Sequence, residues 1–332
     1  MALARTRSGL VLARAAAPAA ATTPRPAARA RMQMVATAPT PTPTVFETAV
    51  ATADAATLKQ QILQLGASLD RGQSYNPTSG AYYAERMAAA RERIEALVRL
   101  APPAPTSLAQ MDGEWELVLA TVPNGIFRSS PFFLAIEDAY VKHAPAGEPT
   151  GVDKLGFFLG ARDNSGRAKA DLFFKLHELQ VCSWGASKVG RVAQQVNSSS
   201  GMLYSEFDTS LFSLTVIPIL GWFKLLPTFG GCVVTASSAR MDAARPGVVQ
   251  LRVEFTTGQK VDGLNGLGAW IWGIKVPVRA AWKLLPWNRG REPTCEIEIA
   301  YLDASFRVVR DLGGEYFAYT RPVVPRAAAA RQ

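Results

Sequence analysis

The end of the chain constrains its fold most, because short runs of alternating apolar and polar residues follow one another there with only turn residues between them. Residues 295–300 precede a polar turn at 303–305, and residues 306–310 precede a Gly-Gly turn. Alternation with a period of two indicates strands, and connections this short indicate antiparallel hairpins. The sequence therefore predicts a terminal meander whose last strand is the aromatic run 316–320.

Two helices are predicted ahead of the strands, within residues 58–100. Leu58, Ile62, Leu65 and Leu69 recur at helical spacing and form one apolar stripe. A second apolar stripe runs through residues 79–100, and the Pro-rich segment after it stops that helix. Because helices come first and a long series of strands follows, the order disfavours a doubly wound α/β fold.

Beyond residue 107 the chain consists mainly of short alternating runs separated by Gly, Asn and Asp. Many short strands of this kind, without a helical period among them, indicate an antiparallel barrel or sandwich. The predicted strands cover residues 115–119, 132–136, 156–159, 171–182, 190–196, 202–207, 232–241, 248–255, 296–301, 306–310 and 316–320.

Gly113, Glu114 and Trp115 form a G-x-W arrangement at the head of the first predicted strand. Glycine lets the chain turn closely under a barrel, and the indole closes that end with a large apolar body. A cationic side chain from the last strands can stack on the indole face. The arrangement is typical of lipocalin-like barrels. The predicted fold class is therefore mainly β, a lipocalin-like antiparallel β-barrel with two N-terminal α-helices.

Three segments resemble one family. Residues 301–310 read Tyr-Leu-Asp-Ala-Ser-Phe-Arg-Val-Val-Arg, residues 128–133 read Arg-Ser-Ser-Pro-Phe-Phe, and an Arg-Gly pair separates the two predicted helices. These segments resemble the plastid lipid-associated proteins, which are the fibrillins of plastids. Phe306 stands where that family usually has Leu and Val308 where it usually has Ile, and both changes keep the apolar character.

The resemblance extends over about residues 58–321. Residues 203–207 and 234–237 are similar to later strands of the family. Two inserts, residues 211–231 and 263–291, have no counterpart in it.

The N-terminal region has the composition of an organelle transit peptide. Residues 1–46 carry six Arg and no Lys, Asp or Glu, and Arg14 interrupts the only stretch that could serve as a secretory signal. With the family resemblance, this composition predicts import into a plastid. The predicted organisation is a chloroplast transit peptide over 1–35, a linker and helix start over 36–57, the fibrillin-like domain over 58–321 and a disordered tail over 322–332.

The formal net charge of +9 does not indicate nucleic-acid binding, because much of it belongs to the N-terminal region. Without the six arginines there, 30 basic side chains remain against 27 acidic ones. A nearly neutral body lacks the basic surface that binds phosphate backbones. We therefore expect no nucleic-acid partner.

Catalytic and cofactor signals are weak in this chain. Cys182, Cys232 and Cys295 lie far apart without a C-x-x-C pair, which indicates buried reduced thiols and no zinc site. The two histidines, His143 and His177, are too few for a multi-histidine metal cluster. The chain lacks a G-x-S-x-G motif and the dinucleotide-binding glycine spacing. No enzymatic activity and no cofactor are expected.

The two inserts are rich in tryptophan interleaved with lysine and arginine, and their apolar runs are too short to span a bilayer. Indole rings favour the head-group level of a membrane, and lysine stems can lie on apolar surface. We predict that the inserts dock on a lipid surface, the alternative being that the tryptophans cover the barrel. The predicted docking residues are Trp222, Lys224, Trp270, Trp272, Trp282, Lys283 and Trp287.

A period of two places Phe306, Val308 and Arg310 on one face of their strand. An arginine among inward apolar residues requires a partner, and Asp303, Glu298 or the Trp115 ring could supply it. An ion pair with Asp303 at the hairpin corner is the favoured alternative to contact with a ligand.

The resemblance implies a protein that binds or partitions a small hydrophobic molecule, such as a prenylquinone, carotenoid, pigment or acyl lipid, at thylakoid or plastoglobule surfaces. A barrel of about eight strands can enclose one such molecule. The alternative is a structural coat or interaction protein with a self-filled barrel, which supports a prenyl-lipid enzyme as its plastid partner. The residues expected to bind the ligand are Trp115, Phe132, Phe133 and Arg310.

Overall fold

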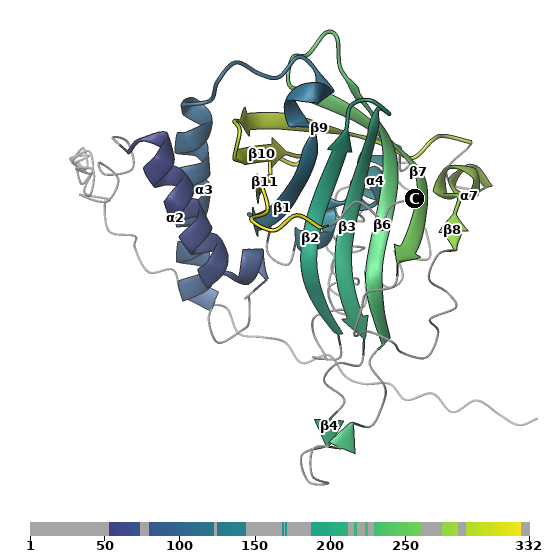
Figure 1. Ribbon diagram of the computed structural model, residues 1–332, viewed down its shortest axis with the longest axis horizontal. Coiled ribbons are helices and arrows are strands. Elements are labelled where there is room, and N and C mark those ends of the chain that lie inside the picture. The colour runs from purple at the N-terminus through teal and green to yellow at the C-terminus, as the bar shows by residue number, and fades with distance from the viewer. Residues whose placement is uncertain are drawn as a thin grey trace, which may run out of the picture. The chain divides into compact units, whose positions relative to one another are not determined.

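The computed structural model describes residues 53–73, 80–122, 125–143, 168, 170, 187–211, 216–217, 223–224, 229–259, 274–284 and 290–326. This part of the chain is mainly β (Figure 1). The strands are β1 (Gly113–Ala120), β2 (Ser187–Asn197), β3 (Met202–Leu211), β4 (Val216–Ile217), β5 (Phe223–Lys224), β6 (Phe229–Met241), β7 (Val248–Gln259), β8 (Lys275–Val276), β9 (Thr294–Leu302), β10 (Phe306–Arg310) and β11 (Tyr316–Thr320). The helices are α2 (Ala55–Ser68), α3 (Gly80–Arg99), α4 (Pro131–His143) and α7 (Val278–Leu284), with 3₁₀ turns η1 (Asp70–Gly72), η2 (Leu108–Met111) and η3 (Gly125–Ser129).

Nine strands form one antiparallel sheet in the order β6-β3-β2-β1-β11-β10-β9-β7-β8. β6 also pairs with β7, so the sheet closes on itself as a ring (Figure 1). Closure removes the unpaired edges that would otherwise attract other strands. β4 and β5 pair only with each other. The antiparallel, mainly β character predicted from the sequence is confirmed.

The terminal meander has the predicted arrangement. β10 pairs with β11 from Phe306 opposite Thr320 to Arg310 opposite Tyr316. On its other side β10 pairs with β9, with a register shift between Val308 and Val309. β11 then pairs with β1, so the end of the chain lies beside the first strand of the sheet.

Hydrophobic cores lie on both faces of the sheet. One core fills the ring interior and includes inward side chains of β1, β2, β3, β6, β7, β9, β10 and β11 together with η3, α4 and α7. The other lies between α2, α3 and the outer side of β1, β9, β10 and β11. A register shift in β1 directs Leu117 to the interior and Leu119 to the helices.

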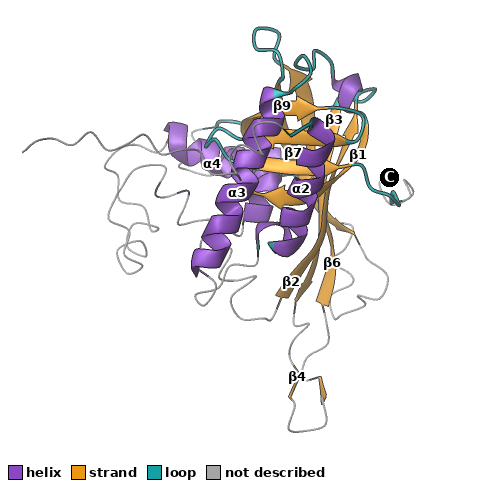
Figure 2. Cartoon of the chain, turned by 90° about the vertical axis from the view of Figure 1, so that its left-hand side faces the viewer, coloured by secondary structure: helices purple, strands orange, loops and turns teal. Residues whose placement is uncertain are grey.

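The predicted helix pair corresponds to α2 and α3, which lie side by side (Figure 2). Leu58, Ile62 and Leu69 of the predicted stripe are buried, and Leu65 packs at the margin of the helix core. Gly66 allows close contact with β1, because a Cβ there would lie 2.4 Å from the carbonyl oxygen of Val118.

The Arg-Gly pair between the helices makes a tight connection. Arg71 has a positive φ of 59°, and its guanidinium donates to the carbonyl oxygens of Gly190 and, at 3.2 Å, Val189. Gly72 has a φ of 97°, and a Cβ there would lie 2.4 Å from the carbonyl oxygen of Ala120. The pair therefore anchors the helices to β1 and β2.

Residues 132–136, predicted as a strand, belong to helix α4 instead. Pro131 occupies the first helical position, where its fixed φ and missing N–H favour a helix start. The carbonyl oxygen of Ser130 accepts from the backbone N–H of Leu134 at 3.1 Å, which continues that first turn. A short apolar run fits a buried helix as well as a buried strand, and the proline decides between them.

The other strand predictions have mixed outcomes. The predicted runs at 115–119, 190–196, 202–207, 232–241, 248–255, 296–301, 306–310 and 316–320 all fall within strands of the main sheet. Residues 156–159 and 171–182 lie outside the described residues. The insert 211–231 contains β4 and β5, and the insert 263–291 contains β8 and α7.

Candidate functional site

The ring interior is occupied in part by the chain itself, through η3 and α4. Residues 133–138 of α4 are consecutive and all buried, so this part of the helix is covered on every side. Its start touches opposite parts of the ring. On one side, the side-chain amide of Gln194 on β2 donates to the carbonyl oxygen of Ser129 at 2.8 Å. On the other side, the thiol of Cys295 on β9 lies 3.6 Å from the carbonyl oxygen of Pro131.

A row of five aromatic rings crosses this interior, and we call it the aromatic row. It starts at Trp282 on α7 and runs through Phe132 and Phe133 on α4 to Phe127 on η3 and Phe207 on β3. Successive ring centres lie 6.3, 5.4, 5.5 and 5.7 Å apart, and three of the four contacts are edge-to-face. Edge-to-face geometry places ring hydrogens on a π face. Phe132 is only partly buried, whereas its neighbours Phe133 and Trp282 are buried.

Trp115, near the start of β1, is fully buried in the interior core. Its indole N–H donates to the carbonyl oxygen of Met111 at 2.7 Å. The guanidinium carbon of Arg307 lies 4.9 Å from the ring centre and that of Arg321 lies 3.7 Å from it. Gly113, with a φ of 96°, leaves room for Arg321, because a Cβ there would lie 2.8 Å from Nη1. The predicted stacking of a cation on this indole is confirmed.

Arg307 heads a buried polar chain inside the ring. Its Nη2 donates to the side-chain oxygen of Gln194 at 2.6 Å, and Gln194 in turn donates to the backbone of Ser129. The same guanidinium lies 4.6 Å from the centre of the Tyr319 ring. Burial raises the pKa of Tyr319 to about 12, so its phenol stays neutral and can donate.

A second buried arginine in the interior has a carboxylate partner. Arg128, at the end of η3, donates to Glu137 of α4 at 2.6 Å, and both side chains are buried. This ion pair ties η3 to the helix inside the ring. Breaking such a buried pair by removing one partner is costly, because it leaves a charge without compensation.

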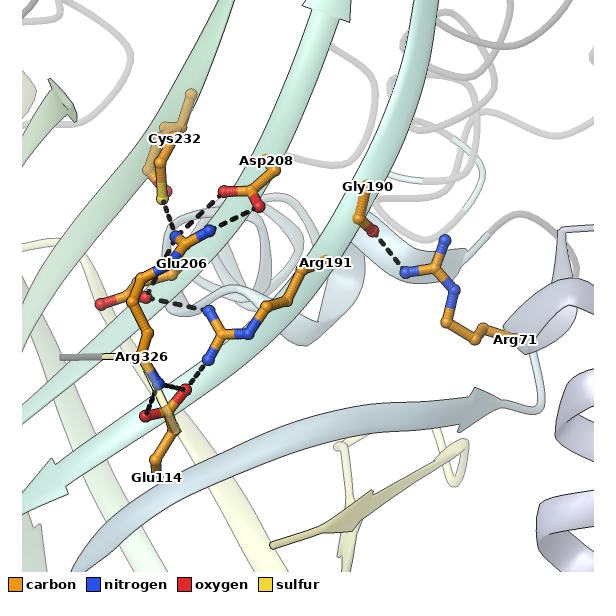
Figure 3. Close-up of polar contacts among 9 residues, drawn as sticks. Arg71, Glu114, Gly190, Arg191, Glu206, Asp208, Cys232 and Arg326 are labelled. Atoms are coloured by element: carbon orange, nitrogen blue, oxygen red, sulfur yellow. Dashed lines mark hydrogen bonds and ion pairs between the residues drawn. The ribbon is translucent and has the colours of Figure 1, made fainter. Parts of the chain in front are cut away.

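The outer face of β1, β2, β3 and β6 carries a group of polar side chains, together with one arginine from the segment after β11. We call this group the outer cluster: Glu114, Arg191, Glu206, Asp208, Cys232 and Arg326. Figure 3 shows Arg326 reaching from the segment after β11 across β3 to Asp208, with Nη1 and Nη2 at 3.1 and 2.8 Å from its two oxygens. The backbone N–H of Arg326 donates to Glu114 at 3.1 Å. Arg191 pairs with Glu114 and, at 3.3 Å, with Glu206.

Cys232 is the sulfur member of the outer cluster. Arg326 Nη1 lies 3.5 Å from its thiol. Burial raises the pKa of Cys232 to about 12, and the nearby charges of Asp208 and Glu206 act in the same direction. The thiol is therefore protonated at neutral pH and poorly suited to nucleophilic chemistry. Cys295 is also free and buried, so two of the three cysteines have the predicted placement, and Cys182 lies outside the described residues.

Scans against protein-family models, curated proteins and solved structures gave no match to this chain. The likeness to plastid fibrillins therefore rests on the short motifs quoted above. Among the described residues, no group of three or more His, Cys, Asp or Glu is placed to hold a metal ion. Within that same part of the chain, no helix has both the length and the apolar character of a membrane span.

Three of the four predicted ligand-binding residues lie in the interior. Trp115, Phe132 and Phe133 all belong to or pack against the interior core. Arg310 lies outside the interior, because its side chain is 42% exposed and pairs with Glu298, with Nη2 at 2.5 Å from the carboxylate. Glu298 was one of its three candidate partners. The favoured Asp303 instead binds Lys59 of α2.

The predicted docking residues lie in different places in the structure. Trp282 is buried in the interior core, so its assignment to a membrane-facing rim is wrong and the folded-back alternative holds for it. Lys283 is exposed and lies 3.1 Å from Glu292. Lys224 belongs to β5. The remaining docking residues, Trp222, Trp270, Trp272 and Trp287, lie outside the described residues.

Arg307, Gln194 and Arg321 are interior or plug residues that were not predicted as site residues from the sequence. On β10 the alternation itself is correct, but Phe306 and Val308 face the helices, and Arg307 faces the interior. Both faces of this strand are covered, so apolar residues do not identify the inner one. The sequence feature that could have identified these arginines is the G-x-W motif, because a cation from the last strands is expected to stack on its indole.

Proposed function

We propose that this protein binds a small apolar molecule inside the closed sheet, against the aromatic row. The observation that carries the proposal is the row itself, five rings in contact with Phe132 partly exposed among them. Flat rings at such spacing offer edges and faces to a planar or isoprenoid ligand. Each methylene transferred from water to such a surface contributes about 0.8 kcal/mol. Binding of this kind needs no covalent chemistry.

The finer fold assignment is part of the same proposal. Ring closure, the plugging Trp115 with its two cations, and the outer helix pair support a lipocalin-like barrel of the plastid fibrillin type. In such a barrel the ligand enters at the end opposite the plug. The aromatic row is joined to the plug through Ser129 and Gln194, which border both.

Organic extraction of the protein purified from its own organelle, followed by mass spectrometry, tests the proposal. A prenylquinone, carotenoid, pigment or acyl lipid in stoichiometric amount is the expected result. In vitro, a short-chain prenylquinone should quench tryptophan fluorescence, with at least threefold weaker binding to a Phe132→Ala variant. Tyr82→Ala, which removes an exposed ring of α3, is the matched control and should bind as the parent does.

A structural or interaction protein is the second candidate, and α4 favours it. Six consecutive buried residues of this helix already fill part of the interior, as a self-filled barrel requires. If extraction yields no ligand and the quinone does not quench, the protein acts instead through its surface as a coat or as the partner of a prenyl-lipid enzyme. Co-purification from the organelle would then identify the partner.

Plastid targeting and peripheral lipid docking complete the proposal. Fusion of residues 1–46 to a fluorescent protein should direct it into chloroplasts, and N-terminal sequencing of the native protein should find a start near residue 36. Trp222, Trp270, Trp272 and Trp287 are the remaining candidates for contact with thylakoid or plastoglobule surfaces. Replacing Trp222, Trp272 and Trp287 together by Ser should abolish liposome flotation without changing the circular dichroism spectrum.

A further inference from the structure

The Arg307 guanidinium is a fully buried charge without a carboxylate partner among the described residues. Its contacts there are the neutral amide oxygen of Gln194 and the rings of Trp115 and Tyr319. No acceptor for its Nε lies among the residues that the structure describes. The contrast with Arg128 is direct, because that arginine shares the interior and has Glu137 as its counter-ion.

A lone buried cation is unusual because desolvating it costs several kcal/mol. The two aromatic rings offset part of this cost, since their π faces attract a desolvated cation. Burial lowers the pKa of Arg307 to about 10, which still leaves it charged at neutral pH. The free Nε and the uncompensated charge therefore favour an anionic oxygen beside this side chain.

Three buried serine hydroxyls of the interior also have no hydrogen-bond partner within the described part of the chain: Ser130, Ser205 and Ser237. Ser205 on β3 lies directly opposite Gln194, and Ser237 lies opposite Leu203 on the same inward face. Ser130 follows Ser129, which binds Gln194. Directly opposed residues on one face have Cβ atoms about 5 Å apart and diagonal ones about 7–8 Å apart, so Ser205 lies beside Gln194 and Ser237 one diagonal step further along the same face.

We propose that Arg307, with Ser205 and Ser237, binds the carboxylate of an amphipathic ligand whose apolar chain lies along the aromatic row. This inference rests on the proposed function and narrows the ligand to a carboxylate-bearing chain, such as a fatty acid. The guanidinium supplies the charge and Nε a donor, and each serine supplies an O–H donor. Gln194 holds the guanidinium in place through its side-chain oxygen.

Laurate and 1-dodecanol test the inference, because they share a chain and differ in the charged end. Isothermal titration should give at least tenfold tighter binding of laurate to the full-length protein. The double variant Ser205→Ala/Ser237→Ala should lose threefold or more of the laurate affinity and keep its dodecanol affinity. It should fold normally, because removing an unpartnered buried hydroxyl leaves no group unsatisfied.

Arg307→Met is the direct variant and should remove the preference for laurate over dodecanol. If this variant does not fold, the serine double variant decides the question. Equal binding of laurate and dodecanol by the parent would overturn the carboxylate site and leave the proposed function intact. An unchanged preference in the serine variant would assign those hydroxyls to water and overturn their role. Failure of both probes to bind would overturn the proposed function as well.

Discussion

The guanidinium of Arg307 lies 4.9 Å from the centre of the Trp115 ring, and this contact joins the first strand of the ring to the end of the chain. Because β11 lies between β1 and β10, the contact crosses an intervening strand on the interior face. Arg321, just after β11, adds a second cation to the same ring. The surroundings of this indole thus depend on residues almost two hundred positions apart, and no single segment can form them alone.

Trp115→Ala should lower the free energy of unfolding by about 3–5 kcal/mol, because it removes a fully buried ring and leaves a cavity beside two cations. Urea unfolding followed by circular dichroism measures the change. Tyr82→Ala is the matched control, since that ring is 57% exposed and its loss should change the stability by about 0.5 kcal/mol or less. Equal midpoints for the two variants would contradict the plugging role.

Much of the fold follows from local pattern in the sequence. The alternation in β9 predicts a strand because its side chains are in turn buried and half-buried, and the short turns that follow predict its pairing with β10 and β11. The spacing of Leu58, Ile62 and Leu69 predicts α2, because its apolar stripe is the part that packs on the sheet. Both are short-range relationships that a period can encode.

The candidate site was harder to predict because it depends on long-range contacts. Arg310 and Arg307 sit on opposite faces of β10, and only the position of α2 and α3 decides which face is interior. Phe132 and Phe133 were expected on a strand, and helix α4 brings them into contact with Trp282 instead. The hydrogen bond between Gln194 and Arg307 joins residues 113 positions apart, and no local pattern around either residue predicts it.

Asp303→Asn should destabilise the protein by about 1–2 kcal/mol at pH 7, because hydrogen bonds to a charged partner exceed neutral ones in strength. Asp303 accepts from Lys59 of α2 and, at 2.7 Å, from the Tyr301 phenol. Burial opposes ionisation of this carboxyl, but these bonds and two turn N–H groups hold its pKa below the ordinary value of 3.8.

The pH dependence of that difference follows from the lowered pKa. A carboxyl with a lower pKa in the folded state contributes its stability above the unfolded pKa and loses it as pH falls towards the folded pKa. The stability gap between the parent and Asp303→Asn should therefore be constant above about pH 5 and narrow below pH 4. A gap that does not change between pH 7 and pH 3 would show that the charge contributes nothing.

Cys232 and Cys295 should resist iodoacetamide at pH 8 in the folded protein and react fully in urea, as peptide mass spectrometry would measure. Both thiols are buried, and burial raises the pKa of each, to about 12 for Cys232. Because the unfolded thiols ionise near pH 9 while the folded ones stay protonated, their contribution to stability should be lost as pH rises above 9. Rapid labelling of either thiol in the native protein would contradict the buried placement.

Arg326→Gln should release the segment after β11 from the outer face and lower the free energy of unfolding by about 1–3 kcal/mol, the cost of leaving the partly buried Asp208 carboxylate without its cation. Arg326 bridges Asp208 and Glu114 and covers the thiol of Cys232. Labelling of Cys232 should therefore accelerate at least tenfold, whereas Cys295, in the interior, should keep its parent rate.

Val323→Ser is the control, because it changes a residue of the same segment that is 99% exposed and should leave both labelling rates unchanged. Equal acceleration at the two cysteines would instead indicate general loosening of the fold, and unchanged labelling of Cys232 would show that Arg326 does not hold this segment in place.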